Sequence, residues 1–297
     1  MIINLKSSFS EQFQEIINTI DEYGSESQPR DLKVRELLIG QILVNPTDVF
    51  ADFESRKFNF KYFAGEVAWY LNRDRDIDYI NQFSGFWKGI TNPDSNEINS
   101  NYGNLLFGDQ LKWVYDSLVK DQNSRQAIAF LNQPKFQFEG NKDFVCTMYL
   151  NFFIRDNELN MKVQMRSNDI FYGLTYDAPF FAFVHQHMYL WLKETYPSLT
   201  LGSYIHCADN IHYYEHHFDL SKSVTAENTG LRQKYTMNIT EPFFILDKNG
   251  NYHLTSKGMT YINRVNRLVG SDAKMSDYKD LITEFMLNTK QKENVRL

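Results

Sequence analysis

The chain has little cysteine and no excess of positive charge. Its two cysteines, Cys146 and Cys207, are too few for a disulfide framework and suit a reducing compartment. The formal net charge of −6 over 297 residues excludes the broad basic surface of a general nucleic-acid-binding protein. A few arginines can still hold one phosphate locally. We therefore expect no direct nucleic-acid partner, whereas binding of a small phosphorylated ligand remains compatible with the charge.

The sequence also lacks a signal peptide and a long hydrophobic run. Its first residues, "MIINLKSSFSEQFQEI", have neither the basic start nor the apolar core of a secretion signal. The most apolar stretch, 170–192, is interrupted by Asp177, His185 and His187, so it is a poor membrane span. The prediction is a soluble, cytoplasmic protein without a membrane partner, in which 42% hydrophobic residues build a sizeable core.

What is present is a mixture of helical and strand patterns without strict alternation, which is typical of an α+β fold. Helices are expected at 7–24, where Ser8 and Glu11 form a capping box, and at 60–73, 107–121 and 177–195. Strands are expected at 35–46 and 199–208, with hairpins over 143–167, turning at "RDNE", and over 243–255, turning at Asn249-Gly250. The charged stretch 271–297 predicts a peripheral helix and a frayed tail. With no clear linker, residues 1–297 are expected to form one domain.

Asp177 is the most unexpected residue of the sequence. It lies between two largely aromatic and aliphatic runs, in "RSNDIFYGLTYDAPFFAF". A lone buried carboxylate is destabilising by several kcal/mol or more unless it has a partner. A helix N-cap just before Pro179 is the simpler interpretation, and a ligand-binding role is the other.

Cys146 and Arg166 are predicted to meet across the first hairpin. With a turn at 156–157, position 166 lies close across from position 147, so Arg166 can reach Cys146. A free cysteine is most often a small buried hydrophobe. A nucleophilic thiolate needs a nearby cation to lower its pKa, and Arg166 is the candidate.

Two metal-like patterns carry less weight. "HYYEH" (212–216) matches an inverted zinc-peptidase motif, in which His212 and His216 share a helical face and Glu215 is the general base. Such short patterns arise easily by chance, and no convincing third ligand follows. The acidic run "RDRDID" (73–78) lacks the glycine and glutamate of a calcium loop, so it is expected to be a solvated helix start. No metal is expected.

Several segments together resemble the thymidylate synthase superfamily. "VC" followed by "RSNDIFYGL" and Asp177 resembles its core, in which a cysteine precedes an R-S-x-D-x-x-x-G segment. The similar segments follow the family's order over roughly residues 28–220: "QPRDLKVREL", "GEVAWYL", "GFW", "NSNYG", "NSRQAI" and "NIHYY". Agreement of this kind in the correct order is unlikely to arise by chance. Residues 221–297 do not obviously carry the family's closing tail.

The resemblance implies a fold and a set of partners. The fold would be a thymidylate synthase-like mixed β-sheet, covered by helices on one face, with the sheet's other face used for dimerisation. The partners would be a nucleotide, the co-substrate 5,10-methylenetetrahydrofolate and a second copy of the chain. "DFVCT", "MRSND" and "INSNYG" look like the deoxycytidylate (dCMP) hydroxymethylases of bacteriophages, which implies the cytoplasm of a phage-infected cell.

The resemblance also implies roles for particular residues. Catalysis would use Cys146 as the nucleophile, with Glu66, Tyr102 and Asp177. The nucleotide would be bound by residues from several segments: Arg30, Arg125, Arg166, Ser167, Asn168, Asp177, His212 and Tyr214. The folate would be bound by Trp69, Trp87, Asp169 and Gly173. Arg125 would act across the dimer interface, and Gln126 replaces the family's second arginine there.

Asp177 stands where thymidylate synthases carry the asparagine that reads uracil. Cytosine presents an amino donor at ring position 4 and an acceptor nitrogen at position 3. A carboxyl group can accept from the amino group and share a proton with that nitrogen, and a low-dielectric pocket would raise its pKa. The carboxyl group at 177 therefore favours cytosine, and the resemblance to phage enzymes implies hydroxymethylation of carbon 5 of dCMP. A dCMP methylase, a CMP hydroxymethylase, a zinc hydrolase and a catalytically silent homologue are the alternatives.

Overall fold

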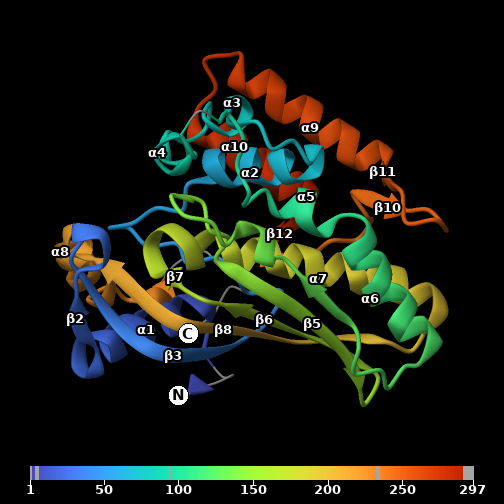
Figure 1. Ribbon diagram of the computed structural model, residues 1–297, viewed down its shortest axis with the longest axis horizontal. Helices are drawn as coiled ribbons and strands as arrows, with labels where there is room; N and C mark the ends of the chain where they lie inside the picture. The colour runs from blue at the N-terminus through green and yellow to red at the C-terminus, as the bar shows by residue number, and fades with distance from the viewer. Residues whose placement is uncertain (1, 4–6, 94, 232–234, 290–297) are drawn as a thin grey trace, which may run out of the picture.

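A computed structural model of the chain describes residues 2–3, 7–93, 95–231 and 235–289. Its centre is a mixed sheet in the order β1-β3-β8-β6-β5-β4, with β2 added beside β3 and β7 beside β8 (Figure 1). The strands are β1 Ile2–Ile3, β2 Ser25–Ser27, β3 Val34–Val44, β4 Ile128–Phe130, β5 Thr147–Arg155, β6 Glu158–Met165, β7 Asn168–Asp169 and β8 Thr200–Tyr214. β8 runs parallel to β6 and β7 and antiparallel to β3. The predicted α+β class is confirmed.

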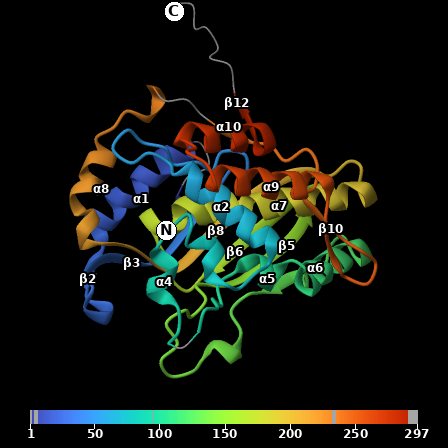
Figure 2. The same cartoon turned by 90° about the horizontal axis from the view of Figure 1, so that it is seen from above.

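Alternation along the strands shows why helices cover one face only. In β6, every second side chain is buried: Leu159, Met161, Val163 and Met165. The side chains between them, such as Lys162 and Gln164, are half-buried and point to the opposite face. The buried face packs against α7 Thr175–Thr195, and α2 Phe60–Asn72, α9 Ser256–Val269 and α10 Met275–Met286 lie beyond α7 (Figures 1 and 2).

The remaining helices lie around this core. They are α1 Phe9–Tyr23, α3 Ile77–Ile80, α4 Phe86–Ile90, α5 Tyr102–Leu106, α6 Asp109–Lys120 and α8 Phe218–Thr225. Short helical turns are η1 Pro29–Asp31, η2 Pro134–Phe136, η3 Ile170–Leu174, η4 Glu215–His217 and η5 Thr229–Leu231. The smaller strand pairs are β10 Phe244–Leu246 with β11 Tyr252–Leu254, and β9 Tyr235–Met237 with β12 Leu287–Thr289. Among the described residues, no helix is both long enough and apolar enough to cross a bilayer.

The structure confirms the helix caps and the turn that were predicted from local residue patterns. The Ser8–Glu11 capping box starts α1, and Gly24 ends it by donating its N–H to the carbonyl of Ile20. Asp156 and Asn157 form the β5–β6 turn with φ of 52° and 61°, a left-handed conformation that these residue types tolerate. Asp76 caps α3, as expected for a solvated helix start.

Three expectations are corrected. The strand expected at 199–208 continues as β8 to Tyr214, so "NIHYY" is strand. The helix in 271–297 is not peripheral, because Tyr278, Leu281 and Ile282 of α10 are buried. The expected frayed tail lies mostly in 290–297, outside the described residues. Asp177 is not an N-cap: η3, a π-helical turn, leads directly into α7, and Asp177 lies within the first turn of α7.

Candidate active site

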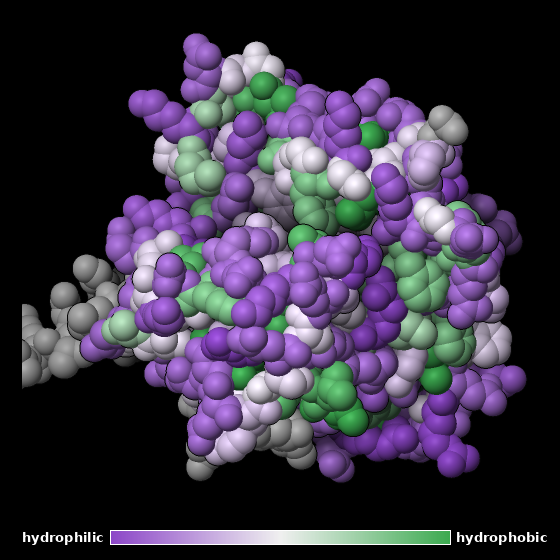
Figure 3. All heavy atoms as spheres, turned by 60° about the vertical axis from the view of Figure 1, so that its left-hand side comes forward, coloured by the Kyte–Doolittle hydropathy of each residue, from purple (hydrophilic) through white to green (hydrophobic). Residues whose placement is uncertain are grey.

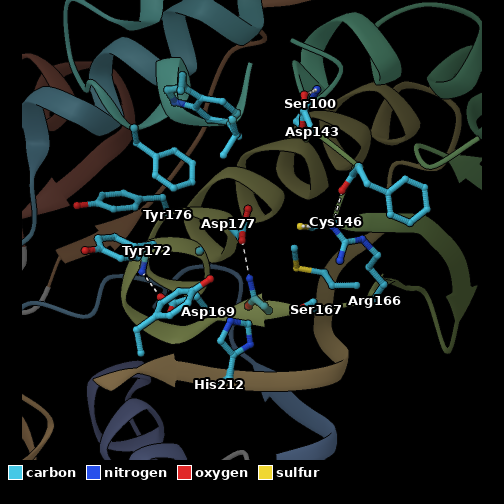
Figure 4. A pocket seen from close by; sticks show the side chains of 18 of the residues that line it. Ser100, Asp143, Cys146, Arg166, Ser167, Asp169, Tyr172, Tyr176, Asp177 and His212 are labelled. Carbon is cyan, nitrogen blue, oxygen red and sulfur yellow. Dashed lines mark hydrogen bonds between the residues drawn. The ribbon is translucent and has the colours of Figure 1, made fainter. Parts of the chain in front are cut away.

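A cavity of about 1000 Å³ opens where the ends of β6 and β7 face α2, α4 and the start of α7. All but two of the residues proposed for the site line it. They are Arg30, Glu66, Trp87, Tyr102, Cys146, Arg166, Ser167, Asn168, Asp169, Gly173, Asp177, His212 and Tyr214. In Figure 4, Asp177 projects between Cys146 with Arg166 on one side and Tyr172 with Tyr176 on the other. Figure 3 shows that the face bearing α8 and β2 is mainly hydrophilic, with hydrophobic residues in small groups.

Cys146 and Arg166 meet as the hairpin predicts. The register of β5 with β6 brings Arg166 beside Cys146, and the Arg166 backbone N–H donates to the Cys146 carbonyl at 2.9 Å. The guanidinium Nη2 lies 3.3 Å from the Cys146 Sγ. The guanidinium also donates to the carbonyls of Val145 and Phe144, which fix its position. A thiol and a permanent cation therefore share one end of the cavity.

Burial outweighs the cation at this thiol. Loss of solvation raises the pKa of Cys146 above its ordinary value, although Arg166 acts to lower it. Arg166 therefore acts on the thiol pKa in the expected direction, but the loss of solvation has the larger effect. Asp177 and Asp143 also raise the Cys146 pKa, because their negative charge disfavours a thiolate. A thiol with a raised pKa is protonated at neutral pH.

Asp177 has a protein partner inside the cavity. Asn168 donates from Nδ2 to the Asp177 Oδ2 at 2.7 Å (Figure 4). Burial raises the pKa of Asp177 to about 6, and the Asn168 hydrogen bond acts in the opposite direction. The pKa is raised as the low-dielectric pocket predicts, and the carboxyl group titrates close to neutral pH.

Glu66 is surrounded by hydroxyl groups on its own helix. Tyr62 donates to the Glu66 Oε1 at 2.6 Å and Tyr70 at 3.3 Å, both one helical turn away in α2. Burial raises the pKa of Glu66 to about 8. The Trp87 indole donates from Nε1 to the Tyr62 hydroxyl at 3.2 Å, so the cavity wall is tied to this carboxyl group. Tyr62 was missed from the sequence, although its i−4 spacing from Glu66 was a usable signal.

Arg30 and His212 come from distant segments to the same cavity. Arg30 lies in η1 with φ of 53°, and His212 lies near the end of β8. His212 Nδ1 is 2.8 Å from the Asn210 Oδ1, and Asn210 in turn donates to the Glu36 Oε2 at 2.7 Å. Burial lowers the pKa of His212 to about 4, so its ring is neutral. The Asn210 oxygen accepts the single N–H of this ring from Nδ1, so Nε2 is left to accept from a hydroxyl group.

The zinc-peptidase alternative fails on secondary structure. His212 is in strand β8, whereas Glu215 and His216 are in η4, so the two histidines do not share a helical face. His216 Nε2 instead lies 3.0 Å from the Tyr172 hydroxyl. Within the described parts of the chain, no group of three or more His, Cys, Asp or Glu side chains is arranged to hold a metal ion.

Trp69 and Arg125 do not line this cavity. The Trp69 side chain is fully buried, with its ring centroid 5.0 Å from that of Trp87, so it lies behind the wall and does not face a ligand. The structure therefore does not support the expected direct contact of Trp69 with a folate, because Trp69 packs behind Trp87. Arg125 is exposed in the loop between α6 and β4, away from the cavity of its own chain.

Beyond Asp177 the cavity is lined by aromatic side chains and by the carboxyl group of Asp169. Asp169 accepts the backbone N–H groups of Phe171 and Tyr172 through Oδ1, whereas its buried Oδ2 has no hydrogen-bond partner. Burial raises the pKa of Asp169 to about 7. An unsatisfied carboxyl oxygen can accept an N–H group from a bound heterocycle. The aromatic walls here also include residues that the sequence did not single out: Phe86, Tyr172 and Tyr176.

Comparison with known proteins agrees with this geometry. The family model described as thymidylate synthase matches residues 11–247, further at both ends than the 28–220 expected. The chain belongs to the thymidylate synthase family. It is an enzyme of that family, whose reaction is the transfer of a one-carbon group and whose co-substrate is methylenetetrahydrofolate.

Particular relatives include two kinds of phage hydroxymethyltransferase. The deoxycytidylate 5-hydroxymethyltransferase of Enterobacteria phage T6 is 30% identical over 173 residues, which cover 54% of this chain and 70% of that protein. The deoxyuridylate hydroxymethyltransferase of Bacillus phage SP01 is 27% identical over 221 residues, which cover 68% of this chain and 56% of that protein. The thymidylate synthase of Mycoplasma genitalium is 24% identical over 215 residues, which cover 61% of this chain and 73% of that protein.

Proposed function

We propose that this enzyme hydroxymethylates carbon 5 of dCMP, using 5,10-methylenetetrahydrofolate and water. The observation that carries the substrate is Asp177, a carboxyl group in the cavity beside Cys146 that titrates near pH 6. As a carboxylate it accepts from the cytosine amino group, and it can share a proton with the adjacent ring nitrogen. The similarity to phage dCMP hydroxymethyltransferases supports the same base.

Cys146 acts as the nucleophile in this proposal. Its proton leaves, and the sulfur bonds to carbon 6 of the pyrimidine, which makes carbon 5 nucleophilic. Arg166, 3.3 Å from the sulfur, stabilises the thiolate and would also bind the nucleotide phosphate. Asp177 donates a proton to ring nitrogen 3 or shares one with it, which disperses the negative charge that the addition creates on the ring.

Methylenetetrahydrofolate supplies the one-carbon unit that carbon 5 takes up. Glu66, held by Tyr62 and Tyr70, is the group that holds water and accepts the carbon-5 proton through it. Loss of the carbon-5 proton and departure of tetrahydrofolate leave an exocyclic methylene group on the pyrimidine. Water then adds to this methylene group, the sulfur–carbon 6 bond breaks, and Cys146 is released. Trp87 would form a wall for the co-substrate, and Asp169 would accept from it.

Product analysis tests this proposal. The purified enzyme is incubated with methylenetetrahydrofolate and either dCMP, dUMP or CMP, and the products are identified by mass spectrometry. Hydroxymethyl-dCMP without dihydrofolate is the expected result. A methyl product together with dihydrofolate would mean a methylase, and turnover of CMP equal to that of dCMP would mean a ribonucleotide enzyme.

Hydroxymethylation of dUMP is the second candidate. A protonated carboxyl group presents one donor and one acceptor, as the amide of asparagine does, so it can pair with uracil. The Asp177 pKa of about 6 makes this form accessible, and the Bacillus phage relative is named for dUMP. Preference for dUMP at pH 8, where Asp177 is ionised, would establish this alternative.

Glu66→Gln is expected to stabilise the protein at alkaline pH. The folded-state pKa of Glu66, about 8, is above the ordinary value, so its stabilising contribution is present at low pH and is lost as the pH rises toward 8. At pH 8.5 the variant should therefore melt at least about 3 °C above the unaltered enzyme, and the difference should shrink toward pH 5. Thermal melts without ligands measure it. Exposed Glu139→Gln is the control and should leave the melting temperature unchanged at both pH values.

Arg125 is inferred to act in the partner subunit of a homodimer. Its exposed position away from its own cavity fits a contact with the nucleotide phosphate of a second copy. Arg125→Ala should raise the KM for dCMP about tenfold with little change in kcat. Light scattering on the same samples should give the mass of a dimer. Exposed Lys120→Ala is the control, and equal effects of the two substitutions would argue against a specific phosphate contact.

A further inference from the structure

A chain of buried hydrogen bonds lies behind Asp177. The Tyr204 hydroxyl is 2.6 Å from the His206 Nδ1, and His206 Nε2 is 3.0 Å from the Asn168 Oδ1. Asn168 donates in turn to Asp177 at 2.7 Å. Tyr204 and His206 are 0% and 1% exposed in β8 and do not line the cavity, so they act on a ligand only through Asn168.

The donor and acceptor groups of these residues allow only one donor-to-acceptor order along the series of hydrogen bonds. Burial lowers the pKa of His206 to about 3, so the ring is neutral and has a single N–H. The Asn168 Oδ1 can only accept, which places that hydrogen on Nε2 and makes Nδ1 the acceptor of the Tyr204 hydroxyl. The Asn168 amide then has its NH₂ group toward Asp177. Turning the amide over would place its oxygen against an oxygen of the Asp177 carboxylate.

Gly173 leaves room for the Asn168–Asp177 hydrogen bond. A Cβ atom at Gly173 would lie 2.5 Å from the Asn168 Nδ2 and 3.0 Å from the Asp177 Oδ2. Both distances are too short for ordinary contacts, so a side chain there would displace one of the two groups. The hydrogen bond is therefore accommodated from the cavity side by Gly173 and held from behind by His206.

We propose that His206 and Tyr204 are positioning residues that fix the Asn168 amide and thereby set how Asp177 discriminates between cytosine and uracil. The inference rests on the proposed role of Asp177 in reading the base. Without the His206 N–H, the Asn168 amide can rotate. Its oxygen then favours a protonated Asp177, the form that also pairs with uracil.

The test compares His206→Leu, which removes both ring nitrogens, with His206→Gln, which can donate to Asn168 and accept from Tyr204. Calorimetric titration with dCMP and with dUMP at pH 8 gives the ratio of the two affinities. The ratio should fall about tenfold in His206→Leu, because a buried polar group loses its partner. It should return to within about threefold of the unaltered value in His206→Gln. His185→Leu is the control, since His185 is an equally buried histidine that takes no part in the hydrogen bonds between Tyr204, His206, Asn168 and Asp177. This substitution should leave the ratio unchanged.

Tyr204→Phe provides a second variant if His206→Leu does not fold. It keeps the ring and removes only the hydroxyl group, and it should lower the ratio about threefold. A folded His206→Leu or Tyr204→Phe protein with an unchanged ratio would overturn the proposal, as would an equal loss in His185→Leu. Preference of the unaltered enzyme for dUMP would refute the proposed substrate alone. In that case a ratio of dCMP to dUMP affinity that shifts further toward dUMP in His206→Leu supports the positioning role, and an unchanged ratio refutes it.

Discussion

Cys146→Ala is expected to lower kcat by about 10⁴-fold or more, because no other group can form the bond to carbon 6 of the pyrimidine. The affinity for dCMP should change much less, since the phosphate and base contacts come from other residues. Formation of hydroxymethyl-dCMP, followed by mass spectrometry, measures turnover, and calorimetry measures binding. The surrounding packing should tolerate the change, because Cys146 is only partly enclosed and alanine is smaller.

Cys207→Ala is the matched control for this substitution. Cys207 lies on β8 and is absent from the cavity lining. Its loss should leave kcat within about twofold of the unaltered value, as for a change remote from the chemistry. Undiminished turnover in Cys146→Ala would remove the nucleophile from the proposed mechanism, whatever the effect at Cys207.

Asp177→Asn should lower kcat/KM for dCMP by about 10³-fold and raise it for dUMP. The amide presents a donor and an acceptor that match uracil, and it loses the charge that accepts from the cytosine amino group. Competition between dCMP and dUMP in one reaction, with both products quantified by mass spectrometry, gives the ratio of the two kcat/KM values directly. Exposed Asp156→Asn in the β5–β6 turn is the control, and it should leave the ratio unchanged.

The pH dependence separates the charge of Asp177 from its shape. Below the pKa of about 6 the unaltered enzyme carries a protonated Asp177, so its preference for dCMP over dUMP should weaken as the pH falls from 8 to 5. In Asp177→Asn the titrating group is gone, and the ratio should be flat over the same range. Preference for dCMP that survives the Asp177→Asn substitution would show that another group reads the base.

Much of the fold follows from local signals in the sequence, and the exceptions have physical reasons. Capping boxes and turn residues act within a few positions, which is why the start of α1 and the Asn249-Gly250 hairpin were predicted. The full length of β8 was not predicted, because "NIHYY" is polar and aromatic. This segment becomes a strand only through its pairing with β3 and β7. The packing of α10 on α2 likewise depends on contacts distant in sequence.

The site was located largely through the order of its segments, and its details needed the structure. In α2 nearly every residue from Phe63 to Leu71 is buried, so no periodicity could show that Glu66 faces the cavity and Trp69 does not. The pKa of Cys146 depends on two opposing effects: burial raises it, and the nearby Arg166 guanidinium lowers it. The spacing of residues in the sequence does not show which effect is larger. His206 and Tyr204 share a face of β8 by their i, i+2 spacing, but only the parallel pairing of β7 with β8 brings Asn168 to them.

The short path from Arg166 through β7 and η3 to Asp177 has an evolutionary consequence. This one segment holds the cation beside Cys146, the Asp169 carboxyl group with an unpaired oxygen, and the Asn168–Asp177 pair that is proposed to face the base. Arg30 and His212, from the other side of the cavity, belong to separate parts of the chain. Under the proposed function, mutation or recombination confined to this segment would exchange one pyrimidine for another while the rest of the nucleotide site is inherited unchanged.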